Sequence, residues 1–319
     1  MLSAYQTPSS NPLFVSKNKE LSDLPQELRI IIIDRLDAKS KCRFAQCSFK
    51  CQNDVKMSRN WLKEIRFHAK RAKMTIEVAH DDQSRNSYRL IFEKESRSKY
   101  LKCLNNNGTI LWEQKLDNSL ELSHYATNTF KQMLQKYEKI EEVVLDGWNY
   151  GTLKNHFENL TNLKKLSVEN CKNLYDIIVN FCKPLRSLNI DSISQSLQHF
   201  EQVYKVKDNL NLNKFTLDVC NLKRLNAKTV TMPIGNLSEG DIHLLVNDWQ
   251  NGNWSIEERE FVFDLLDSNF DVSKFLELFD LPNEVKERGF FKVRHHLDAR
   301  LKASLFFLDP TKIIFDVYA

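Results

Sequence analysis

The sequence predicts an α+β fold built from three successive blocks: a helical N-terminal segment, a small antiparallel β-meander and an irregular array of α/β repeats. Three observations support this prediction. Apolar residues recur at three- and four-residue spacings from Leu21 to about His68, strand-like segments follow to about Gln114, and a Leu-x-x-Leu-x-Leu pattern then recurs four times. Hydrophobic residues make up 42% of the chain, which is enough for a packed core.

Length and composition set the class of protein. The chain has 319 residues, a length that typically holds two or three domains. Its net charge of +4 gives no general electrostatic reason to bind nucleic acid or a membrane surface. The seven cysteines include no C-x-x-C pair, no secretory leader opens the sequence, and the longest apolar run is Ile30–Ile33. We therefore expect reduced thiols, no membrane span and a cytoplasmic or nuclear location, with residues 1–20 as a mobile tail.

Residues 21–55 predict a helix-rich unit with more apolar surface than it can bury. Pro25 suits the first turn of a helix, because a proline there gives up no hydrogen bond. Leu28, Ile32 and Leu36 form one stripe along this helix, and the adjoining isoleucines extend the apolar surface around it. A unit of about forty residues has too small a core to cover them all. The excess surface therefore packs either on the rest of this chain, as a helical cap, or on another protein.

The same residues resemble an F-box. The match runs through Leu24-Pro25-x-Glu27-Leu28, the Ile31/Ile32 pair, Leu36-Asp37, and a second helix with Cys42, Phe44 and Cys47-Ser48. The resemblance implies a three-helix motif that binds the Skp-family linker of an SCF ubiquitin ligase and, through it, a cullin. The linker-binding residues that it implies are Leu24, Pro25, Leu28, Ile31, Ile32, Leu36, Phe44 and Cys47.

Four segments after the helical block predict the small antiparallel β region at residues 73–122. They are rich in strand-forming residues, and the last two are joined by the turn-forming stretch Asn105–Gly108. The segments are Met74–Ala79, Tyr88–Glu93, Tyr100–Leu104 and Thr109–Gln114.

Residues 123–230 contain the most regular pattern. After a helix predicted at Thr127–Lys139, four segments follow the Leu-x-x-Leu-x-Leu template, with Ile, Val or Phe as substitutes, and start at Ile140, Leu163, Leu185 and Leu212. Successive starts are 23, 22 and 27 residues apart (163−140, 185−163 and 212−185), which is leucine-rich-repeat spacing, with one strand and one helix per repeat. Stacking such repeats buries a continuous core. An ordinary α/β domain with strands of similar composition is the alternative.

An acidic residue follows the template in each of the four segments. Position seven holds Asp146, Glu169, Asp191 and Asp218. In stacked strands about 4.8 Å apart these side chains would form a column of like charge. One hypothesis is that the column attracts a basic segment of a target protein. The alternative is that each strand simply ends there and the carboxylates satisfy turn amides.

The C-terminal part predicts a capped helix and several strands. The helix at residues 237–251 has Ser238 as its N-cap, Asp241 three residues on, and Gly252 as a stop. Strands are predicted at Glu260–Leu266, Phe290–His295, Ala299–Leu308 and Ile313–Tyr318. With the pattern Asp241-Ile242…Trp249-x-x-Gly252, this part resembles the F-box-associated (type 2) region of nematode-type F-box proteins. That resemblance implies a role in target recognition and brings no catalytic residue.

Metal sites and catalysis have little support in the sequence. Cys47 and Cys51 are one helical turn apart and Cys42 is near, but soft-metal sites usually need a second pair, and the adjacent His295 and His296 point apart on a strand. The sequence has no nucleophile elbow, Gly-rich phosphate loop or H-E-x-x-H motif. We expect no enzyme activity, no cofactor and no metal.

The prediction is therefore a substrate-recognition adaptor of an SCF-type ubiquitin ligase, which binds an unknown target with a basic segment. The alternative is a repeat-type protein-binding scaffold without ubiquitin-ligase function. The predicted divisions are a tail at 1–20, the F-box and following helix at 21–68, the β region at 73–122, the repeats at 123–230 and the rest of the F-box-associated region at 231–319.

Overall fold

The chain divides into two compact units, residues 1–59 and residues 60–319. The computed structural model describes isolated residues of the first unit between Leu28 and Cys51, and most of the second. In the second unit the described residues are 61–70, 72–79, 87–137, 139–149, 153–157, 160, 162–172, 174, 177, 184–191, 201–254, 256, 258–266, 268–279, 289–308 and 311–318.

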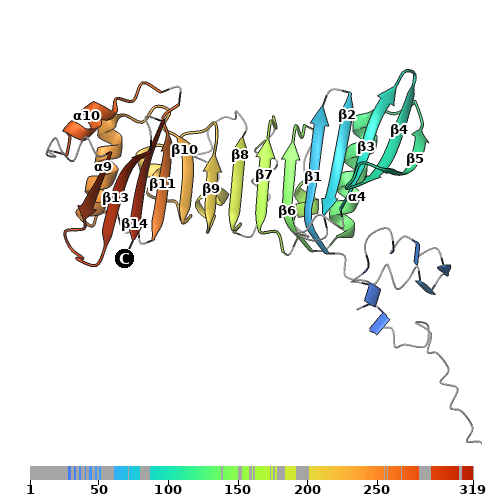
Figure 1. The fold of residues 1–319 in the computed structure, drawn as a ribbon, viewed down its shortest axis with the longest axis horizontal. Coiled ribbons are helices and arrows are strands. Elements are labelled where there is room, and N and C mark those ends of the chain that lie inside the picture. The colour runs from blue at the N-terminus through green and yellow to red at the C-terminus, as the bar shows by residue number, and fades with distance from the viewer. Residues whose placement is uncertain are drawn as a thin grey trace, which may run out of the picture. The chain divides into compact units, whose positions relative to one another are not determined.

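The second unit is built on a single sheet of 14 strands (Figure 1). The strand order is β12-β13-β14-β11-β10-β9-β8-β7-β6-β1-β2-β3-β4-β5. The strands are β1 (Trp61–Lys70), β2 (Lys73–Ala79), β3 (Ser87–Glu95), β4 (Ser98–Asn105), β5 (Ile110–Leu116), β6 (Lys139–Asp146), β7 (Lys165–Glu169), β8 (Ser187–Asp191), β9 (Asn209–Leu212), β10 (Thr229–Pro233), β11 (Arg259–Asp264), β12 (Phe290–Arg294), β13 (Lys302–Leu308) and β14 (Lys312–Tyr318).

The type of strand pairing changes twice across the sheet. The middle strands, from β1 through β6 to β11, are parallel to one another. The flanks, β1 to β5 on one side and β11 to β12 on the other, are antiparallel. The sheet is therefore mixed, with a parallel centre and two antiparallel ends.

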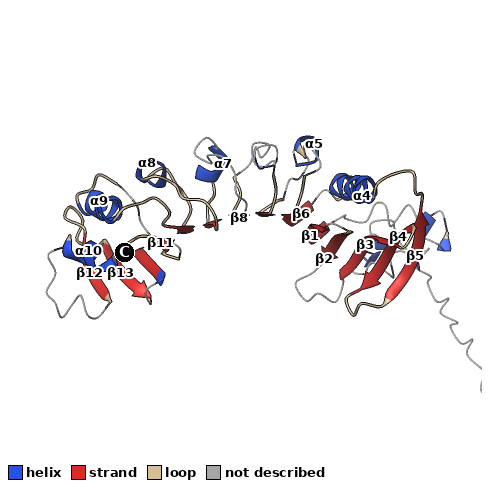
Figure 2. Ribbon diagram, turned by 90° about the horizontal axis from the view of Figure 1, so that it is seen from above, coloured by secondary structure: helices blue, strands red, loops and turns tan. Residues whose placement is uncertain are grey.

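Helices cover one face of this sheet. The helices are α4 (Leu122–Lys136), α5 (Lys154–Phe157), α7 (Glu201–Tyr204), α8 (Val219–Leu222), α9 (Glu239–Gln250) and α10 (Val272–Glu277). Figure 2 shows α4, α5, α7, α8 and α9 on the same side of the strands, along the convex side of a curved sheet. We call this side the helix-covered face and the concave side the open face.

The core lies between the sheet and these helices. Each parallel strand contributes two apolar side chains, two residues apart, and strand pairing aligns them in two ladders. Every member is at most 2% exposed. The first ladder is Ile65, Val143, Leu166, Leu188, Leu210, Val230 and Phe261, and the second is Phe67, Leu145, Val168, Ile190, Leu212, Met232 and Phe263.

The predicted fold class is wrong. The four strands of the predicted meander, β2 to β5, are not a separate region, because they continue the same 14-stranded mixed sheet as the repeat strands. The connection is β1, which is antiparallel to β2 and parallel to β6. The apolar spacing of Leu62 and Ile65 favours a helix there, but pairing on both sides fixes an extended strand. The predicted three-helix unit lies largely outside the described residues.

The fourth predicted repeat is out of register by five residues. Leu212 lies opposite Ile190 and therefore occupies the sixth template position, whereas the sequence alignment gives it the first. The matching fourth position is Leu210, opposite Leu188. The strand therefore ends at Leu212, and the segment that follows it, to Leu217, does not belong to the strand. The observed register places Lys207 at the first template position, whereas the alignment from Leu212 has apolar residues at all three positions. The Leu-rich spacing alone therefore favours the wrong alignment.

The capped helix predicted near the C-terminus is confirmed as α9. The Ser238 side chain accepts a hydrogen bond from the Asp241 amide, and the Asp241 carboxylate accepts one from the Ser238 amide, which makes a capping box. Gly252 follows the helix with φ +74°, a backbone conformation that favours glycine.

Candidate functional site

The open face of the parallel strands presents polar side chains in ordered rows. Because side chains alternate along a strand, the residue between the two buried ladder positions points to the opposite face. On four neighbouring strands this residue is small, polar and uncharged, and strand pairing sets the four side by side. We call this set the polar row; its members are Ser167, Asn189, Asn211 and Thr231.

The polar row contains acceptors that the protein itself does not satisfy. Asn189 Nδ2 donates a hydrogen bond to Ser167 Oγ at 2.9 Å. The Oδ1 atoms of Asn189 and Asn211 are shielded from solvent and have no hydrogen-bond partner among the described residues. Shielded acceptors without partners are costly in proteins, and both side chains are otherwise partly exposed on the open face.

Three of the four predicted acidic residues form the expected column. Asp146, Glu169 and Asp191 lie opposite one another as the last residues of β6, β7 and β8. Asp218 lies elsewhere, because the fourth repeat is out of register. It is the N-cap of α8, where its carboxylate accepts a hydrogen bond from the Asn221 amide at 2.8 Å.

Among the described residues, the backbone amides that follow β6 and β7 do not donate to these carboxylates. Gly147 follows Asp146 with φ +72°, and its N–H donates to the Glu169 carbonyl at 2.8 Å. The Asn170 N–H donates in the same way to the Asp191 carbonyl at 2.9 Å. Backbone carbonyls of the next strand therefore satisfy these turn amides, which removes the main physical reason for the alternative interpretation of the acidic residues.

Each carboxylate of the column instead contacts a neighbouring side chain. Asp146 lies 3.3 Å from His68 Nδ1 and accepts a hydrogen bond from Asn170 Nδ2 at 2.9 Å. Asp191 forms an ion pair with Lys214 at 2.7 Å. The third member, Glu169, accepts a hydrogen bond from Ser167 Oγ at 3.0 Å, which joins the column to the polar row.

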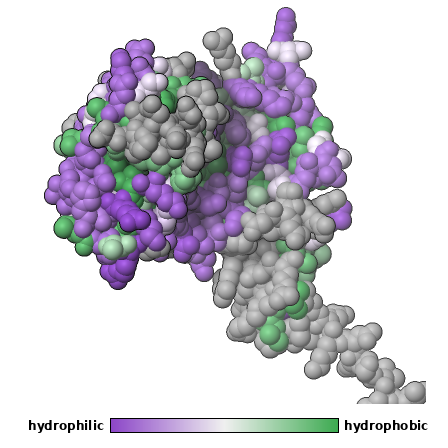
Figure 3. Space-filling model, turned by 60° about the vertical axis from the view of Figure 1, so that its left-hand side comes forward, coloured by the Kyte–Doolittle hydropathy of each residue, from purple (hydrophilic) through white to green (hydrophobic). Residues whose placement is uncertain are grey.

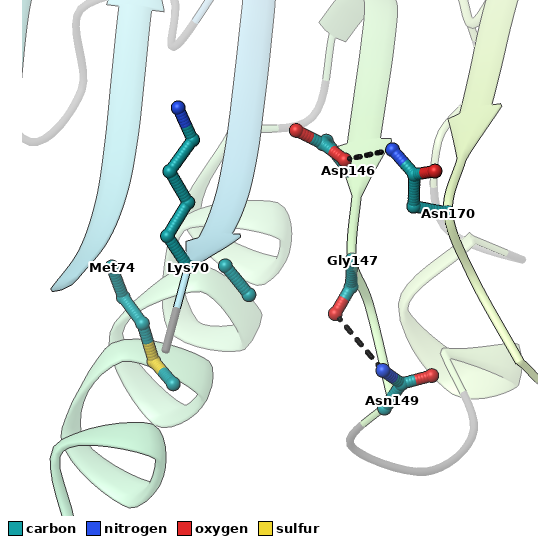
Figure 4. Close-up of a pocket in the computed structure, with 7 residues that line it drawn as sticks. Lys70, Met74, Asp146, Gly147, Asn149 and Asn170 are labelled. Carbon is teal, nitrogen blue, oxygen red and sulfur yellow. Dashed lines mark hydrogen bonds between the residues drawn. The ribbon is translucent and has the colours of Figure 1, made fainter. Parts of the chain in front are cut away.

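A pocket of about 430 Å³ lies at one end of the column. Figure 4 shows Asp146 and Asn170 directed toward each other across neighbouring strands, with Gly147 and Asn149 beside them. A second pocket of about 470 Å³ shares Asp146 and Lys70 with the first. Its other lining residues carry both charges and come from the open face of β1, β2 and β3: His68, Lys73, Thr75, Glu77 and Arg89.

Cys171, which follows the pocket residue Asn170, is not suited to act as a nucleophile. Burial raises the pKa of the Cys171 thiol to about 12, and its Sγ donates to the Leu145 carbonyl at 3.5 Å. Among the described residues no group of His, Cys, Asp and Glu could hold a metal ion. The described helices also include none that is long and apolar enough to cross a membrane. The surface in Figure 3 is mainly hydrophilic, with smaller hydrophobic areas between.

The predicted linker-binding residues can be placed in part. Leu28 and Ile32, one helical turn apart, are 47% and 40% exposed, whereas the neighbouring Ile33 is fully buried. The described helical segment thus turns two large apolar side chains outward. Leu36 and Phe44 are half-buried and Cys47 is exposed. Leu24, Pro25 and Ile31 lie outside the described residues.

A long sheet with one helix-covered face and one polar, concave face is typical of a protein-binding module. The comparison with protein families adds a particular domain: the F-box domain model matches residues 21–63. The chain therefore carries an F-box domain, over the segment where its residues resemble one. F-box domains bind Skp-family linkers, typically in SCF ubiquitin ligases, and F-box proteins are generally adaptors. The match covers well under half of the chain, and no curated protein matches.

Proposed function

We propose that this chain is the substrate-recognition adaptor of an SCF-type ubiquitin ligase. Its F-box domain docks a Skp-family linker and, through it, a cullin, while the second unit holds the target. The observation that carries this proposal is the F-box match at residues 21–63, on a helical segment whose Leu28 and Ile32 are exposed. Exposed large apolar side chains on a small helical unit favour a protein partner.

Docking is tested with full-length chain and a Skp-family protein in a pull-down. Leu28→Asp/Ile32→Asp should abolish capture without lowering the melting temperature, because both side chains are 40% exposed or more. Leu266→Asp, at a 61% exposed leucine of the second unit, is the matched control and should bind as the wild type does. Undiminished capture by the double variant contradicts the docking residues. Failure of the wild-type chain to co-purify with a Skp-family linker and a cullin from cells would favour the alternative, a binding scaffold without ubiquitin-ligase function.

The target is proposed to bind on the open face, across the polar row and the acidic column. The partly exposed amide side chains of Asn189 and Asn211 offer hydrogen bonds to an extended segment. Asp146, Glu169 and Asp191 supply negative charge for a Lys- or Arg-containing segment. Part of that charge is offset within the chain by Lys214, so the uncharged row contributes to specificity as well as the column.

Charge reversal tests this target site. Glu169→Lys/Asp191→Lys should abolish capture of targets, measured as the proteins that co-purify with the wild type and are stabilised in cells when the chain is depleted. Glu201→Lys is the control, because Glu201 lies on α7 of the helix-covered face and its side chain is 66% exposed. An equal loss of target capture in both variants, or no loss in either, would contradict target binding on the open face.

The type of F-box protein is a further part of this proposal. We propose that the chain is of the nematode type and that its C-terminal part, residues 231–319 included, is an F-box-associated (type 2) region acting in a cytoplasmic or nuclear ligase. Structural roles of the motif residues support it. Asp241 makes the capping box, Ile242 and Trp249 are at most 1% exposed, and Gly252 follows with φ +74°.

A further inference from the structure

The strand β5 forms one edge of the 14-stranded sheet. No other strand pairs with its outer side among the described residues. Three consecutive large apolar residues open it: Ile110 is 51%, Leu111 36% and Trp112 45% exposed. Proteins usually protect sheet edges, because unpaired N–H and C=O groups beside apolar side chains invite another strand.

The opposite edge of the sheet is protected in the usual way. On β12, the exposed side chains are Lys292 and Arg294, while Phe291 and Val293 are each 5% exposed. Charged side chains on an edge disfavour strand addition. Exposed charged residues occur on both edges, but Phe291 and Val293 of β12 are buried whereas the apolar residues at the start of β5 are exposed. This difference singles out β5 as an interaction surface.

The apolar face of the sheet continues to β5 beyond its helical cover. Trp112 lies opposite Cys103 of β4, which is 5% exposed and belongs to the core. Helix α4 packs against β2 and β3, so the core ends before it reaches Trp112. An indole that continues the core face but stays 45% exposed indicates a surface that a further strand would cover.

The sequence of β5 is complementary to itself. When two copies are placed antiparallel around Gln114, Trp112 of each lies opposite Leu116 of the other. In the same register Glu113 lies opposite Lys115. Directly opposed residues share a face and interact most strongly in antiparallel pairs. Over residues 112–116 the register thus forms two apolar pairs and two ion pairs, whereas a register centred on Glu113 would oppose two like charges.

We propose that two copies of this chain associate through β5, in an antiparallel pair centred on Gln114 that joins their sheets across a twofold axis. Such an interface is isologous, so each copy supplies the same strand and no further edge is exposed by the pairing. A dimer of this kind carries two F-box domains and two open faces. The occupant is a second copy rather than a target strand, because the charge pattern of β5 matches itself.

Single charge reversals and their mixture test the register, with the mass of the full-length chain measured by light scattering. Glu113→Lys and Lys115→Glu should each be monomeric, because each places like charges opposite one another twice. An equimolar mixture should recover the dimer, since the two lysines of the Glu113→Lys strand then lie opposite the two glutamates of the Lys115→Glu strand. The variants should stay folded, because Lys102, the neighbour of Glu113 at 4.0 Å, also pairs with Glu93 at 2.8 Å and with Glu95.

A second variant addresses the apolar pairs. Trp112→Lys should also give a monomer with an unchanged melting temperature, whereas Leu297→Lys, at a 78% exposed leucine outside the strand, should remain dimeric. A monomeric wild type overturns the proposal, and so does a dimer that persists in both single charge variants. Single variants that are monomeric alone and also in the mixture overturn the twofold register, and indicate a different strand as the partner.

Discussion

Ile65 and Val143 lie opposite each other in a parallel strand pair, and both side chains are fully buried. They are separated by the whole β-meander and by α4 in the sequence. Through this pair, β1 joins the antiparallel flank to the parallel centre in one core. The second unit should therefore unfold as a whole, although its sequence changes character after the meander.

Ile65→Ala tests that joint core. Loss of the buried side chain should lower the free energy of unfolding by about 2–5 kcal/mol, because it leaves a cavity in the core where β1 joins its neighbours. Urea unfolding followed by the fluorescence of all five tryptophans should give one shifted transition, although Trp112 lies in the flank and Trp148 at the β6 end. Thr75→Ala, on the open face of β2, is a control with a small expected effect. Two separate transitions would contradict a shared core.

Gly147→Ala tests the turn that follows β6, where Gly147 lies close to Ala69 of β1. Gly147 has φ +72°, and a Cβ there would lie 2.8 Å from the Ala69 carbonyl oxygen, a backbone atom that cannot move aside easily. Gly108→Ala is the matched control, because its φ is +77° but nothing lies within 4 Å of its added Cβ. Both variants should lose about 1–3 kcal/mol for the left-handed backbone, and Gly147→Ala should lose clearly more. If both variants lost the same stability in thermal unfolding, the close approach of Gly147 to Ala69 would not constrain this position.

The sequence predicted local structure better than its assembly. The Leu-x-x-Leu-x-Leu pattern identified the strands β6, β7 and β8, and the acidic residue after each was correctly expected to align with its neighbours. The fourth strand was misplaced because its true register has Lys207 at the first apolar position of the pattern, and only pairing with β8 reveals that register. The sequence pattern does not single out Asn189 and Asn211, for a related reason. They stand between two buried template positions, and their alignment becomes visible only when the fourth segment is shifted.

The strand β1 shows why the sequence alone does not predict the sheet topology. Its residues Leu62 and Ile65 have a helical spacing, while Ile65 and Phe67 have a strand spacing. The choice between helix and strand depends on pairing with β6, which lies far from β1 in the sequence. A local sequence pattern does not reveal such long-range pairing. It therefore indicates a separate meander rather than one continuous sheet.

Thiol reactivity follows from burial. Cys171 is 3% exposed, and burial raises its pKa to about 12, whereas Cys220 is exposed on α8. Because the thiolate is the reactive form, iodoacetamide at neutral pH should modify Cys220 quickly and leave Cys171 intact. Peptide mass spectrometry measures both sites in one sample, and urea-unfolded protein, in which both should react, is the control. Early modification of Cys171 in the folded chain would show that this part of the core opens readily.

Acid sensitivity should come in part from His243. This side chain lies on α9 with its ring 4.7 Å from that of Phe279, and burial lowers its pKa below the ordinary value of 6.5. The folded state therefore binds this proton less tightly than the unfolded state does. Stability due to this group is unaffected above pH 6.5, falls as the pH drops below that value, and stops falling below the folded-state pKa.

His243→Gln should therefore flatten the decline of the melting temperature between neutral pH and about pH 5. Leu244→Gln is the matched control: it changes the next residue of α9, which is 48% exposed, and adds no ionisable group. Its melting temperature should follow the pH as the wild type does. Burial also lowers the pKa of His156, with the charge of Lys131 acting in the same direction. The double variant His156→Gln/His243→Gln should accordingly be flatter than either single variant, because the two sites lie on separate helices and take up protons independently on unfolding. A decline as steep in the double variant as in the wild type would assign the acid sensitivity to other groups.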